Sequence, residues 1–275
     1  MMDMVANKVR KELGVKTPRV AIMMESTMSA RRIANCIRGW APKMGLEVVC
    51  EVSPSSMASD VTPELNAIEK SGAHIIVTGF SGPVGVATAR KWGQLKIPAA
   101  LVGCNPPSQR KGYWDYTNKF CNYELAWGAF GPVAISDKTI PFVKKFEQKH
   151  NDYPIWTAGT YDVIYIFKDA IERAGTLDSD AVVAELEKTD YIGAQGRMAF
   201  NPRGHKYPHE SKTGPGYLTG VGNQWQDGKL VTVWPDGSPG NPAVGDKAWE
   251  KGVKYEGTQE YKLPPWMVEY WKNKK

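Results

Sequence analysis

The run from Ser55 to Pro107 constrains the fold most, because it alternates helical and extended patterns twice. Leu65 and Ile68 recur at helical spacing, and Gly72 then ends the helix as a C-terminal cap. Two short apolar runs are typical of strands buried on both faces of a parallel sheet. The predicted order is helix, strand, helix and strand, over 62–71, 73–78, 85–95 and 99–103.

The same alternation extends upstream, with strands at 19–24 and 46–52 and a helix over 30–44 between them. Residues 16–107 therefore indicate one lobe built on a parallel sheet with right-handed crossovers. Ligands of open α/β sheets bind outside the carboxyl ends of the strands. We therefore expect the loops at 79–83 and 104–108 to matter most.

The composition excludes several classes of protein. The chain has 275 residues, of which 42% are hydrophobic and 23% charged, as in globular proteins. Its net charge of +6 is spread along the sequence, which disfavours a nucleic-acid surface. No apolar run approaches the roughly 20 residues that span a membrane. The amphipathic start at 1–14 lacks the apolar core of a signal peptide.

The rest of the chain is helical and then extended. A helix over 157–174 has apolar groups on nearly all sides, which predicts a buried helix. The clearest hairpin joins 217–225 to 229–234 through Gln226, Asp227 and Gly228. The further predicted elements are an irregular stretch at 108–128, a short strand or crossing segment at 129–135, helices at 140–150 and 179–188, a turn-closed strand at 193–205, and a terminal helix at 264–274.

No pattern of residues indicates enzymatic chemistry, a cofactor or a metal. The turn Gly79-x-x-Gly82-x-x-Gly85 has the wrong spacing for a dinucleotide fingerprint. No Walker A loop and no Gly-x-Ser-x-Gly motif is present. The cysteines form no C-x-x-C pair and have no histidine at metal-ligand spacing. They can be free thiols or the disulfides Cys36–Cys50 and Cys104–Cys121.

Four segments together resemble the type I periplasmic solute-binding proteins of ABC importers, in the branched-chain amino-acid branch. The resemblance covers residues 5–235 and rests on the order and spacing of the segments. They read KVRKELGVKTPRVAIMMEST (8–27), DVTPELNAIEKSGAHIIVTGF (60–80), AGTYDVIYIFKDAIERAG (158–175) and IGAQGRMAFNPRGH (192–205).

This resemblance implies an α/β fold with two Rossmann-like lobes on parallel sheets. Lobe one is expected to be incomplete, with its first part upstream of Met1. The implied organisation is an opening helix at 1–15, lobe two at 16–128 plus 217–234, late helices of lobe one at 136–200, and an extended C-terminal arm at 235–275.

The resemblance also implies the function. The chain is expected to be the substrate-binding component of an ABC transporter that captures a small amino-acid-like, carboxylate or amide solute by hinge closure. Its partners would be the ligand and permease subunits in the membrane, without nucleic acid or a cofactor. Its location would be periplasmic, or extracellular and membrane-anchored. The alternatives are a ligand-sensing regulator or receptor domain of the same fold, and an α/β enzyme.

The ligand contacts implied by the resemblance lie on three loops and one helix. Asn105 aligns with a family carboxylate that holds an ammonium group, although an Asx turn before two prolines explains this residue equally well. Phe80 is a cleft or core-edge contact. Glu25 is interpreted as a solvated loop residue rather than a cleft charge, and Asp162 as a favourable charge at a helix start. The predicted ligand-binding residues are Ser26, Thr27, Ser29, Phe80, Ser81, Asn105 and Tyr161, with capping as the alternative for Thr27 and Ser29.

Overall fold

The computed structural model describes residues 1–155, 157–241, 243 and 249–274. The chain divides into two compact units. Unit 1 comprises Met1–Gly128, Gly222–Lys254 and Thr258–Lys275, and unit 2 comprises Ala129–Val221 and Tyr255–Gly257. Over the described residues, every helix is too short or too polar to cross a bilayer.

Unit 1 is built on a seven-stranded sheet of order β2-β1-β3-β4-β5-β8-β9. The first five strands in the chain pair in parallel, whereas β8 and β9 form an antiparallel hairpin. The parallel lobe predicted from residues 16–107 is confirmed. The strands are β1 (Arg19–Met24), β2 (Glu47–Val52), β3 (Ile75–Gly79), β4 (Ala100–Cys104), β5 (Leu125–Gly128), β8 (Val221–Gln226) and β9 (Lys229–Trp234).

Helices cover this sheet because its central strands are apolar on both faces. In β1, Val20 and Ile22 join the large core cluster together with residues of α1, α2 and α9, and the intervening Ala21 is fully buried as well. Gly72 ends α3 with a φ of 69°, as predicted. The helical elements are α1 (Met2–Leu13), α2 (Met28–Trp40), η1 (Pro42–Met44), α3 (Thr62–Ser71), α4 (Val84–Gln94), η2 (Pro106–Gln109), α5 (Tyr113–Tyr116) and α9 (Pro265–Asn273).

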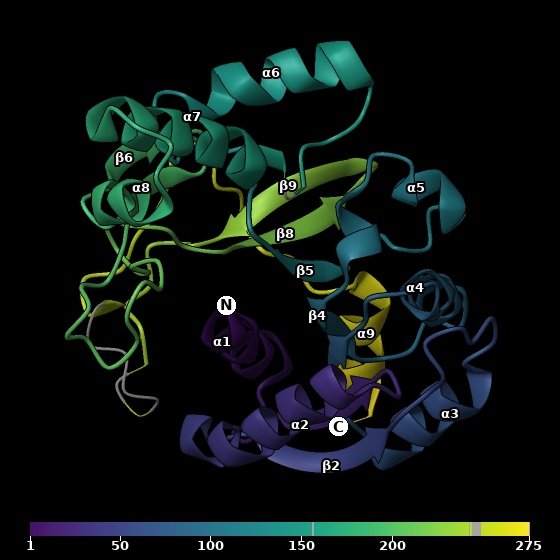
Figure 1. The fold of residues 1–275 in the computed structure, drawn as a ribbon. Coiled ribbons are helices and arrows are strands. Elements are labelled where there is room, and N and C mark those ends of the chain that lie inside the picture. The colour runs from purple at the N-terminus through teal and green to yellow at the C-terminus, as the bar shows by residue number, and fades with distance from the viewer. Residues whose placement is uncertain (156, 242, 244–248, 275) are drawn as a thin grey trace. The chain divides into compact units, whose positions relative to one another are not determined.

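The hairpin β8–β9 extends the sheet beyond β5 (Figure 1). Its turn is formed by Asp227 and Gly228, which both have positive φ, as a tight two-residue turn requires. Of the two alternatives predicted for 129–135, the strand is wrong, whereas the crossing segment agrees with the passage of the chain from unit 1 to unit 2 at Ala129. Strand β5 lies instead within the stretch predicted to be irregular. All four cysteines are free thiols.

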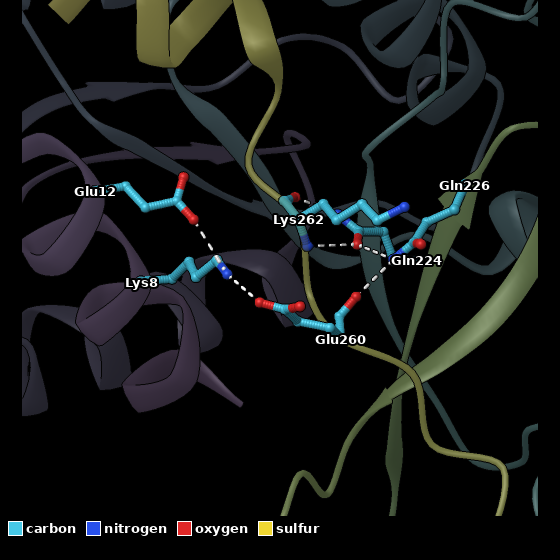
Figure 2. Close-up of polar contacts among 6 residues, drawn as sticks. All are labelled: Lys8, Glu12, Gln224, Gln226, Glu260 and Lys262. Atoms are coloured by element: carbon cyan, nitrogen blue, oxygen red, sulfur yellow. Dashed lines mark hydrogen bonds and ion pairs between the residues drawn. The ribbon is translucent and has the colours of Figure 1, made fainter. Parts of the chain in front are cut away.

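The segment that precedes α9 is tied to both α1 and β8 (Figure 2). The side-chain amide of Gln224 is fully buried. It donates to the backbone carbonyl of Lys262 at 2.8 Å and accepts from the backbone amide of Lys262 at 3.0 Å, so it bonds to this segment as a neighbouring strand would. Lys8 bridges Glu12 and Glu260, at 3.1 and 2.5 Å. Part of the predicted C-terminal arm therefore belongs to unit 1.

Unit 2 contains three helices and a two-stranded sheet among the described residues. One hydrophobic cluster of buried residues in this unit consists of Phe130, Val143, Ala158 and Ala194. The helix predicted at 157–174 is confirmed at those bounds. The elements are α6 (Thr139–His150), α7 (Thr157–Ala174), α8 (Ser179–Leu186), β6 (Asp190–Gly193) and β7 (Gly196–Ala199).

The prediction that α7 is a buried helix is wrong for one side of it. The buried side of the helix consists of two alanines, one isoleucine and one aspartate: Ala158, Asp162, Ile166 and Ala170. The opposite side exposes large apolar groups, including Ile164 at 65% and Phe167 at 49%. Unit 2 has too few elements to cover both sides of this helix, so an apolar surface faces solvent.

We expect this exposed side of α7 to cause self-association that grows with protein concentration. Replacing Ile164 and Phe167 with glutamate removes apolar surface and adds charge, so the double variant should sediment as a smaller species than the unmodified protein. Sedimentation velocity over a range of concentrations measures this. Lys168→Gln, at an exposed position of the same helix, is the control and should behave as the unmodified protein does. Concentration-independent sedimentation of the unmodified protein would contradict the prediction.

Candidate functional site

Three loops follow the carboxyl ends of β1, β3 and β4. The last residues of these strands are in register with one another, so Glu25, Phe80 and Asn105 begin adjacent loops at one edge of the sheet. The amide of Glu25 donates to the carbonyl of Gly79 at 3.1 Å, and the amide of Phe80 donates to the carbonyl of Cys104 at 2.9 Å. These are the loops that were predicted from the sequence to contact the ligand.

Glu25 joins the first loop to the second. Its carboxylate accepts from the Ser81 amide at 2.9 Å and from the Ser81 hydroxyl at 2.5 Å, and it also lies 3.5 Å from the Thr27 hydroxyl. Only 2% of Glu25 is exposed, so its interpretation as a solvated loop residue is wrong. A buried carboxylate must be hydrogen-bonded, and here its partners fix the position of the neighbouring loop.

The predicted serines and threonine along this edge differ in their exposure and in their hydrogen-bond partners. The Thr27 side chain accepts from the Ala30 amide at 3.3 Å and thereby caps α2, as its alternative interpretation held. Ser26, Ser29 and Ser81 are exposed, although the Ser81 hydroxyl already donates to Glu25. The Ser29 hydroxyl shares a hydrogen bond with the Thr27 hydroxyl at 3.3 Å, in which either atom can be the donor. Ser26 and Ser29 are the predicted serines whose hydroxyls are not held by the Glu25 carboxylate.

Phe80 and Asn105 face inward. Phe80 is 4% exposed and Asn105 is 1% exposed. The Asn105 amide donates to Glu124 Oε1 at 2.7 Å, to Tyr113 Oη at 2.9 Å and to the Gly85 carbonyl at 3.4 Å. Its side chain makes no capping bond at η2, so the Asx-turn interpretation is wrong. The predicted ligand contact at Asn105 is likewise at odds with a side chain enclosed by protein atoms.

The group beneath Asn105 is a buried acid. Tyr113 Oη donates to Glu124 Oε2 at 2.8 Å, and Glu124 is 2% exposed. Burial raises the pKa of Glu124 to about 7, despite the hydrogen bonds from Asn105 and Tyr113 that favour its ionised form. Burial next to this acid also raises the pKa of Tyr113 well above its usual value.

Tyr161 belongs to unit 2 and lines a separate groove of about 830 Å³ between α6 and α7. Its hydroxyl donates to that of Tyr165 at 3.4 Å, and this bond raises the pKa of Tyr161 to about 12. Its ring lies 4.9 Å from that of Phe142, and Lys138 lies 4.5 Å from the ring of Tyr191. This groove combines aromatic walls with basic side chains.

Asp162, the next residue, holds the turn between β6 and β7. Its carboxylate accepts from the backbone amides of Ala194 and Gln195, both at 2.8 Å. A β-carbon at Gly193 would meet this carboxylate at 2.2 Å, which explains the glycine. The interpretation of Asp162 as a mere charge at the helix start missed this contact, because the partner lies more than thirty residues away in sequence.

Comparison with known proteins identifies the family. A sequence profile described as Periplasmic binding protein matches residues 1–214. The chain belongs to the periplasmic binding protein family. A curated relative, Leu/Ile/Val-binding protein homolog 7 of Brucella abortus (strain 2308), is 23% identical over 247 residues, which are 86% of this chain and 60% of the relative. The chain thus spans about 60% of the length of the curated relatives it matches.

Solved structures of binding proteins share the fold. A leucine-binding protein, LivK, of Thermotoga maritima gives a TM-score of 0.68 at 20% identity, covering 84% of this chain and 63% of that one. A solute-binding protein of R. palustris in complex with benzoate gives 0.66 at 11% identity, covering 93% and 64%. The α/β fold and the resemblance to the branched-chain amino-acid branch are confirmed. The family model that matches the chain describes binding proteins, which agrees with the expectation that the chain is not an enzyme.

The burial of two acids was not predicted from the sequence, since Glu25 was interpreted as a solvated loop residue and Glu124 was not singled out. Glu25 directly follows a buried strand, and that position alone could have marked it as a residue that joins neighbouring loops. Glu124 directly precedes β5, in a stretch predicted to be irregular, so its sequence context gave no signal. Among the residues that the structure describes, no three His, Cys, Asp or Glu side chains gather where they could hold a metal ion.

Proposed function

We propose that the chain is the substrate-binding component of an ABC transporter and that it delivers a small solute to a membrane permease. The observation that carries the proposal is the set of adjacent loops at the carboxyl edge of the unit 1 sheet, where Glu25 joins the loop after β1 to the loop after β3. Membership of the periplasmic binding protein family supports it. The proposed location is periplasmic, or extracellular and anchored to the membrane.

The proposed ligand is a small carboxylate, with an amino acid or related amide as the nearest variants. The exposed hydroxyls of Ser26 and Ser29 can each donate a hydrogen bond to a carboxylate oxygen. One solved neighbour, from Streptococcus pneumoniae, was determined with isoleucine and the R. palustris protein with benzoate, and both ligands carry a carboxylate. The start of α2 lies beside these serines and favours negative charge.

A thermal-shift screen of amino acids, amides and small carboxylates, followed by calorimetry on the best ligand, tests the proposal. We expect the double variant Ser26→Ala, Ser29→Ala to bind about tenfold to a hundredfold more weakly, since each lost hydrogen bond costs about 0.7–1.4 kcal/mol. Ser179→Ala, an exposed serine in unit 2, is the matched control and should bind normally. Undiminished binding by the double variant would move the site elsewhere, and no stabilisation by any of these solutes would reject the ligand class.

Delivery to a permease separates an importer from a sensor of the same fold. We expect the gene to neighbour genes for permease and ATPase subunits, and its deletion to abolish uptake of the radiolabelled solute found by the screen. Normal uptake in the deletion strain would contradict the transport role while leaving solute binding intact.

A further inference from the structure

The last helix, α9, is fastened to unit 1 by two tryptophans. The indole nitrogen of Trp271 donates to the Pro98 carbonyl at 2.6 Å, and that of Trp266 donates to the Ile97 carbonyl at 3.0 Å. Both carbonyls lie in the segment that leads into β4. Met267, between the two tryptophans, is fully buried. Because parallel strands begin at the same edge of a sheet, α9 is held at the amino edge, opposite the candidate ligand loops.

One histidine joins this helix to two strands. His74 directly precedes β3, and its ring centroid lies 4.4 Å from that of Trp271. Only 3% of His74 is exposed. Its Nδ1 accepts from the backbone amide of Arg19, at the start of β1, at 2.9 Å. A backbone amide can only donate, so Nδ1 carries no proton and the imidazole is neutral, with its proton on Nε2.

The surroundings of His74 oppose a positive charge on its ring. A proton on Nδ1 would point at the Arg19 amide proton, which breaks that hydrogen bond and leaves a backbone donor without its partner. The Trp271 ring already interacts with two cations, the Arg19 guanidinium at 5.7 Å and the Lys274 ammonium at 5.3 Å. Both of them would repel a third cation at the same ring. The neutral imidazole is therefore the form that fits against α9.

The groups that face His74 give the same result. Burial, together with the charge of Arg19, lowers the pKa of His74 to about 4 from its ordinary 6.5. Arg19 is the facing charge from β1, and Lys274 is the charge on α9 that shares the Trp271 ring. From β4, the Ala100 amide donates to the His74 carbonyl at 2.9 Å. The acids on the surrounding elements are exposed, and none of them shifts this pKa: Glu47, Glu69 and Glu269.

We propose that protonation of His74 releases α9 from the amino edge of the sheet, while the rest of unit 1 stays folded. The preceding segment is held separately, because Gln224 bonds to both backbone groups of Lys262 (Figure 2). The released piece is therefore 264–274. Its release carries the Trp271 ring away from the imidazole and admits water, which hydrates the new cation. The proton comes from solvent, and no covalent bond changes.

The direction of the pH dependence follows from proton binding. When α9 is released, His74 titrates near its ordinary value of 6.5, whereas under the fastened helix it binds a proton only at a pH of about 4. The released state therefore binds more protons between these two pH values. The stability that His74 gives to the fastened helix is full above pH 6.5 and is lost as the pH falls to about 4.

Hydrogen exchange of the α9 amides tests the proposal, with His74→Asn as the variant. The side-chain oxygen of asparagine can accept from the Arg19 amide in place of Nδ1, but asparagine cannot be protonated. We expect the exchange rate of the unmodified protein, divided by that of His74→Asn at the same pH, to rise about thirtyfold between pH 8 and pH 5, as the lowered pKa requires. A ratio that stays constant over this range would overturn the proposal.

Two comparisons show that the effect belongs to His74 and to α9. His150→Asn, at an exposed position on α6 in unit 2, should exchange at α9 as the unmodified protein does at every pH. At pH 5 the β3 amides of the unmodified protein should remain better protected than those of α9. Equal protection of β3 and α9 would mean that all of unit 1 opens together, which would contradict the release of α9 alone.

A measurement on the unmodified protein keeps the proposal testable if His74→Asn does not fold. Correlation of the imidazole nitrogens with the ring protons by NMR shows which nitrogen of His74 carries a proton. At pH 6 we expect a proton on Nε2 and none on Nδ1, since Nδ1 accepts from the Arg19 amide. A doubly protonated ring at pH 6, with α9 still protected from exchange, would reject the proposal.

Discussion

Replacing Trp92 with alanine is expected to lower the free energy of unfolding by about 3–5 kcal/mol, the range found for large aromatic side chains in cores. Trp92 lies in α4 and is fully buried. Its indole nitrogen donates to the carbonyl of Ala99 at 2.8 Å, directly before β4, and its ring packs edge-on against Trp266 at 5.3 Å. Alanine leaves a cavity and an unpaired carbonyl at the start of a central strand. Chemical denaturation followed by circular dichroism measures the loss.

Two further variants test whether the loss of stability comes from the burial of Trp92 and from its hydrogen bond. Trp127→Ala removes an indole that is 37% exposed, so its loss of stability should be much smaller. Trp92→Phe keeps most of the apolar volume and loses the hydrogen bond, so it should fall between the unmodified protein and Trp92→Ala. If Trp92→Ala were no less stable than Trp127→Ala, the assignment of Trp92 to the core would be wrong.

Asp162→Ala is the second change with a large expected effect, of about 2–4 kcal/mol, and it acts in unit 2. The substitution leaves the Ala194 and Gln195 amides without their shared acceptor. Each buried donor without a partner costs about 1–3 kcal/mol. Hydrogen exchange at these two amides should accelerate most, because the turn between β6 and β7 loses its anchor. Exchange resolved by residue measures this directly.

The neighbouring Asp169 gives a matched control on the same helix. Its side chain is 43% exposed and lies 3.8 Å from Lys168, so Asp169→Ala removes an exposed ion pair that contributes little. Asp162→Asn retains one acceptor oxygen and should lose about half as much stability as Asp162→Ala. Unchanged exchange at Ala194 in Asp162→Ala would show that the turn does not depend on this carboxylate.

Much of the backbone of unit 1 was predictable, because it depends on local patterns. The apolar runs predicted β1, β3 and β4, and the spacing of Leu65 and Ile68 before Gly72 predicted α3 with its end. The hairpin turn at Asp227 and Gly228 was predictable for the same reason, since positive φ favours these residues. Such signals lie within a few positions of each other in sequence.

The side-chain partners at the candidate site were not predictable, because they come from distant segments. Glu25 meets Ser81 from a different loop, and Asn105 turns toward Glu124 rather than outward. Nothing local distinguishes a buried acid from a solvated one when its partners are brought in by the tertiary fold. The exposed side of α7 has a related cause. Its apolar pattern predicts burial, but whether a partner element covers it depends on the rest of the structure.

The position of β8 and β9 in the sheet has a consequence for synthesis on the ribosome. When the chain has been made as far as Gly128, the first five strands exist, but the strand that borders β5 begins only at Val221. At about 5–20 residues per second, β5 remains an open edge strand for several seconds or longer. Unpaired edges recruit other strands, so nascent chains on one polysome face their greatest risk of pairing with each other during this interval.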